Sequence, residues 1–589
     1  MGALSKSISI LRRANHHGEH GGGRGQCDLI GWLLIPAAKN EKLNATRFKL
    51  PFLLQTLFMQ ATIRPSFALN VICSSLRLVA VGAGLSLAPT LALAQTPPAS
   101  APPAEPDALQ TSPTFLRATT EVLTLPGKEK MGMLGTFMLV DVADGVSLGA
   151  GTYGAITGQR GGFITLGGAA EIRQRITPKL VAHAGLFVGA GGGRGGFQLA
   201  GGGLMLRTDV GLKYETDGYG NLGLGISHVN FPSGVIRSTQ PYLMYEYPFY
   251  SLVGTSGSKA GGGKKSASSL SAKEQEFAVI ARNYRIPTGV VRDDGTPQFP
   301  KMQLAGAEWL SYMDENWFLK VEAEGAAGGQ SNGYMQIFLG GGYRLPITRS
   351  TSIKLHAAAG PAGGGGVDTG GGVVVDAGIG LNQKIFGNNA IELSLSQVRA
   401  PSRSFKATSL GIKLVHSFGL PQVGSRAVAA SSLAGFEPQH VRIRAVQQNY
   451  AGTNPKWRNR EPDTDVGNLG VQFDYFVTPN VFLTGQGLAA YSGKAGAYMK
   501  GLLGGGYRQP ITGPWFAELE GLVGAAGGGG LAVGGGLVAQ GNASVGYQIN
   551  RSLSVMATAG RIKALRGDFE ANVLGLSLGY QFNLFSKAP

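Results

Sequence analysis

The segment Leu574–Leu584, LGLSLGYQFNL, alternates two kinds of residue without a break. Leucine, tyrosine and phenylalanine occupy every second position, and glycine, serine, glutamine and asparagine occupy the others. Because successive side chains of a strand point to opposite faces, this period of two predicts one apolar and one polar face. The segments 319–325 (LKVEAEG) and 390–396 (AIELSLS) follow the same pattern. We therefore expect an all-β protein.

The chain contains a long internal repeat. The segment 340–348 (GGGYRLPIT) recurs at 504–512 (GGGYRQPIT), and a degenerate copy stands at 169–177 (AAEIRQRIT). Self-similarity at a long period indicates repeated structural units. The predicted organisation is as follows: an upstream extension and signal peptide at 1–94, a Pro/Ala-rich linker at 95–114, a first barrel unit at 115–250, a linker at 251–275, a second unit at 276–418, a linker at 419–439 and a third unit at 440–589.

Each unit has room for eight alternating segments. Those of the third unit are expected near 440–451, 467–478, 481–493, 496–509, 515–528, 531–549, 553–564 and 572–584. Segments of this length exceed the 9–11 tilted residues with which a strand crosses a bilayer. No stretch after the signal is long and apolar enough for a membrane helix, so a membrane-spanning form of this chain would use strands.

The connections between the segments alternate in length. Tight turns such as 313–316 (MDEN) and 477–480 (VTPN) follow even segments, whereas longer loops such as 287–300 and 452–466 follow odd ones. Short turns on one side and longer loops on the other are typical of outer-membrane barrels. The alternative is a soluble β-sandwich with aromatic residues at the ends of its core.

The first hundred residues predict export. Residues 77–95 (RLVAVGAGLSLAPTLALAQ) combine a basic flank, a short apolar core and small residues before Gln95, as a secretory signal does. Cys27 and Cys73 both precede the expected cleavage site, so the exported chain would contain no cysteine. Of 52 basic and 35 acidic residues, 10 and 3 precede that site, which leaves 42 − 32 = +10. This charge forms no basic block, so we expect no nucleic-acid partner.

The last strand segment carries a family resemblance. Ser577-Leu578-Gly579-Tyr580-Gln581-Phe582-Asn583-Leu584 resembles the C-terminal assembly signal of bacterial outer-membrane β-barrel proteins, although the tail FSKAP follows it. The resemblance implies insertion by the outer-membrane assembly machinery of a Gram-negative bacterium. It also implies an outer-membrane location, in contact with membrane lipid and lipopolysaccharide.

The predicted fold is a transmembrane, antiparallel up-and-down β-barrel with threefold internal repeat and about 24 strands. The sequence favours one large barrel, because only the last unit carries an intact assembly signal; the alternative is three tandem eight-stranded barrels, which the long linkers favour. Three glycine-rich runs, 188–203, 360–372 and 523–536, interrupt strand-like sequence. We expect them to bend the sheet at a barrel corner, or else to leave the lumen wall free of side chains.

This fold predicts a porin-like or export channel for hydrophilic solutes or polymers. One alternative is a structural or adhesive surface protein built from closed barrels, and a minor one is an enzyme that modifies outer-membrane lipid. No cofactor and no metal are expected. The linkers offer contact points for a periplasmic partner.

Two kinds of site residue stand out. Arg173, Arg344 and Arg508 occupy equivalent positions in the three units, where they would form a lumen-edge ring that attracts anionic solutes, or instead pair with local carboxylates. His228, in ISHVNFPSG (226–234), is faintly similar to the His-and-Ser strand motif of lipid A deacylases. The family's His-x-Ser-Asn order is absent, so the protein is not expected to be an enzyme.

Overall fold

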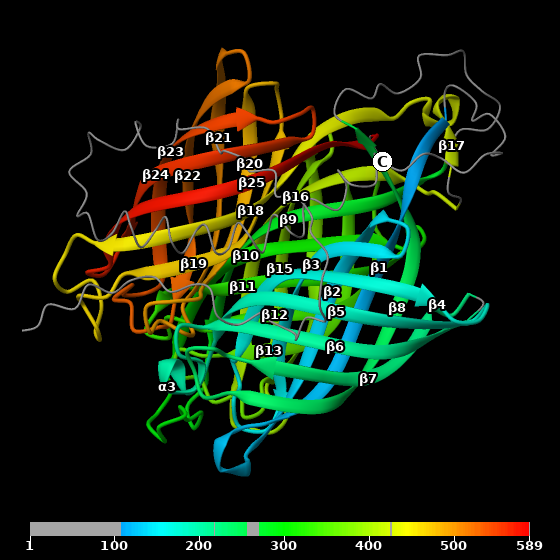
Figure 1. Ribbon diagram of the computed structural model, residues 1–589. Helices are drawn as coiled ribbons and strands as arrows, with labels where there is room; N and C mark the ends of the chain where they lie inside the picture. Colours follow the sequence, from blue (N-terminus) through cyan, green and yellow to red (C-terminus); the bar gives the residue numbers. More distant parts are fainter. Residues whose placement is uncertain (1–107, 217, 256–269, 425–426, 588–589) are drawn as a thin grey trace, which may run out of the picture. The chain divides into compact units, whose positions relative to one another are not determined.

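The computed structural model describes residues 108–216, 218–255, 270–424 and 427–587, which fall within one compact unit, Ile63–Pro589. Antiparallel strands dominate this part of the chain (Figure 1). The signal peptide predicted for 1–94 and both cysteines lie outside the described residues.

The first barrel closes when β8 pairs with β1 over eleven register positions, from Thr111↔Leu252 to Glu121↔Tyr242. Two short helices, η3 (Pro126–Lys128) and α3 (Gly196–Ala200), interrupt its connections. Its strands are β1 (Ala108–Thr124), β2 (Lys130–Ala143), β3 (Val146–Thr157), β4 (Ile164–Arg175), β5 (Leu180–Gly192), β6 (Leu204–Glu215), β7 (Asn221–Asn230) and β8 (Arg237–Thr255).

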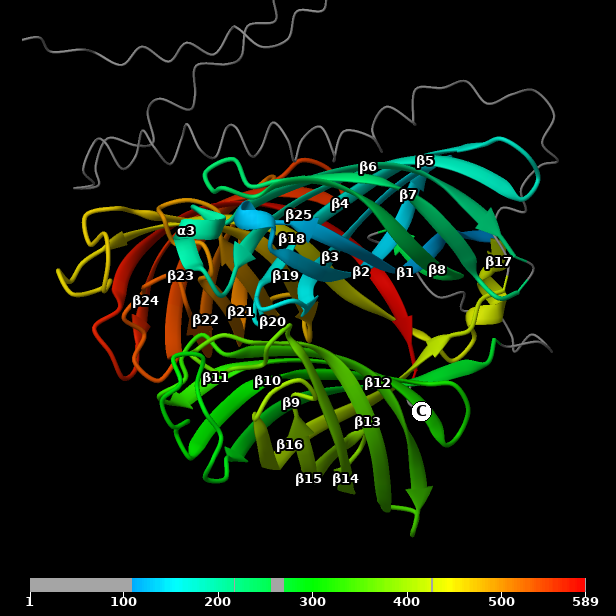
Figure 2. The same cartoon turned by 90° about the horizontal axis from the view of Figure 1, so that it is seen from below.

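The second barrel closes through β9 and β16, which pair from Thr408↔Arg285 to Pro421↔Ala272 (Figure 2). Its strands are β9 (Ala272–Arg285), β10 (Lys301–Tyr312), β11 (Trp317–Gly329), β12 (Met335–Pro346), β13 (Thr351–Gly363), β14 (Val373–Phe386), β15 (Asn389–Arg399) and β16 (Lys406–Pro421).

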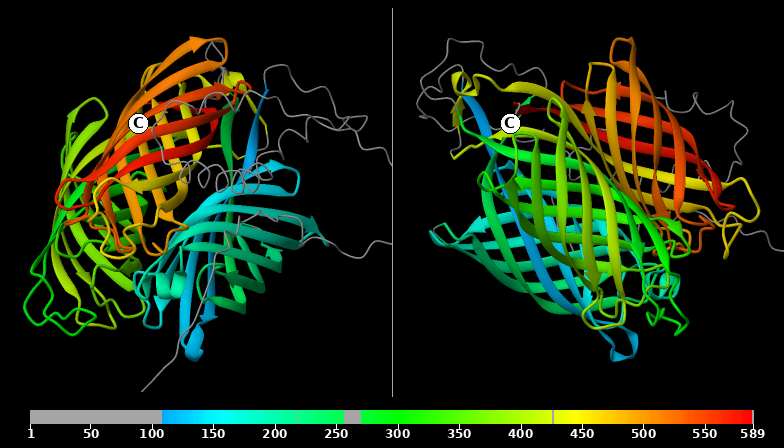
Figure 3. Two further views of the ribbon diagram at one scale, coloured as in Figure 1. Left: turned by 60° about the vertical axis from the view of Figure 1, so that its left-hand side comes forward. Right: turned by 180° about the vertical axis from the view of Figure 1, so that it is seen from behind.

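The third barrel closes through β18 and β25, which pair from Glu437↔Ser586 to Gly452↔Ala571 (Figure 3, yellow to red). Its strands are β18 (Glu437–Gly452), β19 (Val466–Phe476), β20 (Val481–Ala490), β21 (Met499–Thr512), β22 (Trp515–Gly527), β23 (Leu537–Gln548), β24 (Leu553–Ala564) and β25 (Glu570–Ser586). The eight strands predicted for this unit are all present.

The all-β class, the threefold repeat and the 24 barrel strands are thus confirmed, but the favoured closure was wrong. The described residues form three eight-stranded barrels, each closed by pairing of its own first and last strands, instead of one large barrel. The physical reason is that the first strand of each unit forms its edge hydrogen bonds with the last strand of the same unit. No long unpaired edge is then left with which the next unit could pair.

The first two barrels extend slightly beyond the predicted boundaries at both ends, and the third begins three residues before its predicted start. β1 starts at Ala108, inside the predicted linker 95–114. The predicted linker 419–439 contains a short strand, β17 (Ala427–Ala429), which pairs with the start of β1, and a 3-10 helix, η4 (Ala430–Leu433). Phe436, from the same linker, is buried in an apolar cluster.

The barrels are polar inside and apolar outside. On β15, Leu393 and Leu395 are 56% and 47% exposed, whereas Glu392 and Ser394 between them are 1% and 8% exposed. Strand alternation sends one set into the narrow lumen and the other to the outer surface. A soluble barrel would bury the leucines, so this distribution matches a barrel surrounded by lipid.

The glycine-rich runs mediate contacts between barrels. Each run lies between the fifth and sixth strands of one barrel and meets the connection after the third strand of another. The contacts are the Gly161 N–H to the Gly370 carbonyl at 2.8 Å, the Gly496 N–H to the Gly201 carbonyl at 3.0 Å and the Asn332 amide to the Gly534 carbonyl at 2.6 Å.

This role was not among the two expectations for the runs. The fifth and sixth strands of each barrel pair without a register shift. The runs allow backbones to approach closely: a Cβ atom on Gly527 would lie 2.1 Å from the nitrogen of Gly333. Only glycine tolerates such an approach.

Candidate functional site: three filled lumens

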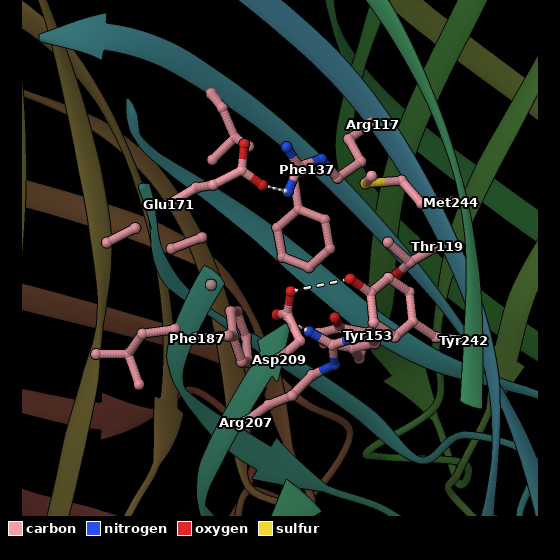
Figure 4. A pocket seen from close by; sticks show the side chains of 15 residues that line it. Arg117, Thr119, Phe137, Tyr153, Glu171, Phe187, Arg207, Asp209, Tyr242 and Met244 are labelled. Atoms are coloured by element: carbon pink, nitrogen blue, oxygen red, sulfur yellow. Dashed lines mark hydrogen bonds and ion pairs between the residues drawn. The ribbon is translucent and has the colours of Figure 1, made fainter. Parts of the chain in front are cut away.

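The lumen of the first barrel is crossed by two groups of ion pairs (Figure 4). Arg117 of β1 lies 2.6 Å from Glu171 of β4 and also binds Glu246 of β8, and Lys213 bridges the same two carboxylates. A small cavity beside them has a volume of about 30 Å³, enough for a water molecule or two. The lumen is therefore filled.

The second group of the first barrel lies around Arg207. Its guanidinium pairs with Glu121 at 2.9 Å and with Asp209. The Tyr242 hydroxyl donates to Asp209 at 3.2 Å (Figure 4). The same hydroxyl lies 2.6 Å from a ring nitrogen of His183. These side chains come from strands on several sides of the barrel, so together they span the lumen.

The second barrel has the densest charge network. Arg282 of β9 lies 2.7 Å from Glu322, 3.1 Å from Glu324 and 3.4 Å from Asp376. Further along the lumen, Lys413 lies 2.8 Å from both Glu308 and Glu392. Lys320 and Lys354 complete the network through the same carboxylates and Glu276. All these groups are buried.

The third barrel combines ion pairs with amides. Arg442 pairs with Asp474 and Glu518, each at 2.7 Å, and Arg444 pairs with Asp474 and Glu520. Lys500 contacts the side-chain oxygens of Gln448 and Gln540. Buried charges need such partners, because an unpaired charge in a low-dielectric interior costs several kcal/mol.

Arg173, Arg344 and Arg508 point into separate lumens, at the short-turn end of each barrel, so they do not form one ring. Arg173 stacks on Phe115 and pairs with Asp141, and Arg344 stacks on Tyr312 and binds Glu274 with both terminal nitrogens at 2.6 and 2.8 Å.

Arg508 stacks on Phe516 at 3.8 Å and donates to Gln548 at 3.0 Å. The Arg508 Nε also lies 3.9 Å from Glu518. All three arginines therefore have a carboxylate partner, and all three cover an aromatic ring. This arrangement closes the short-turn end of each lumen.

The repeated GGGYR segment makes room beside this arginine. A Cβ atom on Gly342 would lie 2.3 Å from the Phe318 ring, and one on Gly506 would lie 2.3 Å from the Phe482 ring. The glycines face the lumen and let a phenylalanine from the preceding strand fill it. The motif thus supplies space for the ring and a cation beside it.

His228 lies on the outer surface of the first barrel, where its ring nitrogen is 2.8 Å from the Thr239 hydroxyl. Ser227 points into the lumen instead and donates to Glu121. Ser233 accepts a hydrogen bond from the Gly202 N–H at 2.8 Å. Neither serine is positioned for activation by His228, so these residues do not assemble the pair that a hydrolase needs.

The lumen network was not among the residues predicted from the sequence, although a signal for it exists. In 319–325 the alternating polar positions are Lys320, Glu322 and Glu324, and all three are charged. Charged residues at successive positions of one strand face indicate ion pairing across a narrow lumen. In a water-filled pore, water would solvate such charges and no ion pairs would be required.

No family model matches the chain, and no curated protein matches it. Among solved structures, the siderophore receptor PirA from Acinetobacter baumannii has a TM-score of 0.25 and 8% identity, and the match covers 81% of each chain. OpdQ from Pseudomonas aeruginosa has a TM-score of 0.19 and 13% identity, over 82% of this chain and 100% of that one. Likenesses at this level say nothing about what this chain binds or carries.

Two further findings concern the described residues alone. They contain no group of three or more His, Cys, Asp or Glu side chains that could hold a metal ion. No helix among them is long and apolar enough to cross a membrane.

Proposed function

We propose that this chain is a Gram-negative outer-membrane protein that embeds three closed barrels in the lipid and serves as a non-conducting scaffold for its long surface loops. The observation that carries this proposal is the inverted barrel, with leucines such as Leu393 on the outer surface and ion pairs such as Lys413–Glu392 in the lumen. The C-terminal strand signal supports insertion by the outer-membrane assembly machinery.

The location is tested with single cysteines in a C27S/C73S background. A spin label on Leu393→Cys should be accessible to oxygen dissolved in the lipid, and a label on Ser394→Cys should not, because the two positions face opposite sides of β15. Equal accessibility of the two labels, or water exposure of Leu393→Cys, would contradict a lipid-embedded barrel.

A channel is the second candidate, favoured by the charged lining of the lumens. Conduction would require the ion pairs to separate, because each lumen is crossed by them from several strands. Recordings of the purified protein in planar bilayers decide between the two functions. We expect no large steady current, since open aqueous channels occur in barrels of 16 or more strands. A large steady conductance would refute the scaffold and support the channel.

The linkers remain candidates for a periplasmic contact. Residues 256–269 of the linker 251–275 lie outside the described residues, whereas the linker 419–439 packs partly against β1 through β17. We propose that any periplasmic partner binds on this side, where the short turns lie.

A further inference from the structure

The outer surface of the second barrel carries four basic residues at the long-loop end of four adjacent strands. Lys301 of β10 lies opposite Arg285 of β9, and Lys406 of β16 lies opposite Arg399 of β15. β9 and β16 are themselves neighbours, with Arg285 opposite Thr408. Because adjacent strands are about 4.8 Å apart, the four side chains share a patch roughly 15 Å wide. We call these four residues the basic rim.

The basic rim lies at the boundary of the apolar outer surface. Next to it, toward the middle of the barrel, is a row of uncharged polar residues, in which Gln397 donates to the Thr408 hydroxyl at 3.0 Å. Beyond that row the same face carries Leu395, Leu410 and Ile412, all 42–47% exposed. The rim therefore stands where a lipid headgroup would meet the barrel.

The dimensions agree with this placement. An aromatic cluster at the other end of the same face includes Trp309 and Phe418, whose rings are 5.5 Å apart. From Lys406 to Phe418 the strand rises about 40 Å, which is about 30 Å along the barrel axis at a tilt of roughly 40°. The apolar band of an outer-membrane barrel is about 25 Å tall, so both groups lie just beyond its edges.

The four cations form no ion pair among the described residues. They are all exposed, and acidic side chains of nearby loops are engaged elsewhere: Asp368 pairs with Arg403 at 3.1 Å and with Arg194 at 3.5 Å. Four like charges on adjacent strands repel one another, and the fold shows no internal compensation for that repulsion. An anion from outside the chain would compensate this repulsion.

The third barrel shows that the fold does not require this charge. The shared GGGYR segments start at 340 and 504, an offset of 504 − 340 = 164, which places Glu570 at the position of Lys406 and Asp465 at the position of Lys301. Glu570 pairs with Arg561 at 2.6 Å. The third barrel is thus acidic at two of the four rim positions, whereas Lys563 stands at the position of Arg399 and Ala451 at that of Arg285. Its Glu570 has a cation partner within the barrel.

We propose that the basic rim binds the phosphate groups of a phosphorylated membrane glycolipid of the lipid A class, whose acyl chains lie on the adjoining leucines. Arginine and lysine clusters at the lipid–water boundary are suited to phosphate, and the continuous apolar face favours a lipid over a free phosphate ion. This inference rests on the proposed outer-membrane location.

The test measures binding of bisphosphorylated lipid A to the detergent-purified chain by native mass spectrometry. The variant K301D/K406E places the third-barrel residues at two of the four rim positions, and we expect its affinity to fall on the order of tenfold or more, equivalent to at least 1.4 kcal/mol. The control R349D/K384E makes the same charge change at the short-turn end of the same barrel and should bind as the unaltered protein does.

Three results would overturn the proposal: equal affinity of K301D/K406E and the control, equal binding of lipid A stripped of its phosphates, or displacement of lipid A by millimolar inorganic phosphate, which would identify a free anion as the ligand. Binding is scored only on protein that shows the heat-modifiable gel mobility of a folded barrel. A wrong location would appear in the spin-label experiment, independently of these outcomes.

Discussion

The second and third barrels fill the same part of the lumen with different side chains, namely an arginine with carboxylates in the second and mainly amides in the third. In the second, Arg282 is the centre of a cluster of three carboxylates, Glu322, Glu324 and Asp376. In the third, the offset of 164 places Gln486, Leu488 and Gln540 at those acidic positions, and the matching segments RNY (282–284) and QNY (448–450) place Gln448 at the position of Arg282.

The cation has moved to another strand in the third barrel. Lys500 stands where the second barrel has Gln336, and it contacts the amide oxygens of Gln448 and Gln540 in place of carboxylates. The two lumens show that the same fold holds a buried central cation either with carboxylates or with amides. The two lumens should therefore respond differently to the loss of their central cation.

The largest effect is expected from Arg282→Gln, which introduces the residue of the third barrel into the second. Three buried carboxylates lose their shared arginine, at a cost of about 3–5 kcal/mol in the free energy of unfolding. Hydrogen exchange followed by mass spectrometry should show faster opening of β9–β16 peptides, with β18–β25 peptides as the internal reference. Unchanged exchange in β9–β16 would show that this network does not stabilise the barrel.

A rescue experiment separates the loss of charge pairing from the loss of packing. Adding Glu322→Gln, Glu324→Leu and Asp376→Gln places third-barrel residues at the three carboxylate positions and removes the carboxylates that have lost Arg282, while Lys320 keeps Glu308 at 3.1 Å. We expect protection from exchange to recover in part. No recovery would mean that packing, and not charge, accounts for the loss.

A smaller effect is expected from Lys500→Gln in the third barrel. The substitution removes a buried charge whose hydrogen-bond partners are both amides, so the lost contacts and the relieved desolvation nearly cancel. The stability of β18–β25, measured by the same exchange experiment, should change by no more than about 1 kcal/mol in either direction. A loss as large as that of Arg282→Gln would contradict the distinction between the two lumens.

The smallest effect concerns the matching turns 313–316 and 477–480. Backbone N–H groups of Trp317 and Asn316 donate to the Asp314 carboxylate at 2.7 and 2.8 Å and hold the pKa of that carboxyl below its usual value. In the third barrel, Thr478 accepts the same kind of bond through a hydroxyl at 2.9 Å from the Val481 nitrogen, and a hydroxyl does not titrate in this range.

A carboxyl whose pKa is lowered by folding stabilises the turn above its unfolded pKa and loses that contribution as the pH falls through the folded value. The turn at 313–316 should therefore loosen below about pH 4, while the turn at 477–480 should not. Amide hydrogen exchange at the two turns, corrected for the pH dependence of the intrinsic exchange rates, measures this difference. Asp314→Thr should abolish the pH dependence; persistence of the dependence in that variant would assign it to another group.

The positions of Arg173, Arg344 and Arg508 illustrate what could be predicted of the site. Their equivalence and their place at a strand end are properties of the repeat, and each does lie at the short-turn end of a lumen. Their partners were beyond prediction, because Glu274 lies 70 residues from Arg344 and meets it only through barrel closure. His228 shows the converse, since its neighbours in sequence, Ser227 and Ser233, face other directions.

The sequence by itself determined the strands, their two faces, the tight turns and the threefold repeat, because these depend on periods of two and on turn residues close together in the chain. Only the tertiary structure decided that β1 pairs with β8, β9 with β16 and β18 with β25, since pairing of distant strands leaves no local pattern. The contacts of the glycine runs, the lumen ion pairs and the basic rim follow from that closure. Each brings together groups that are far apart in sequence, where distance and burial decide the interaction.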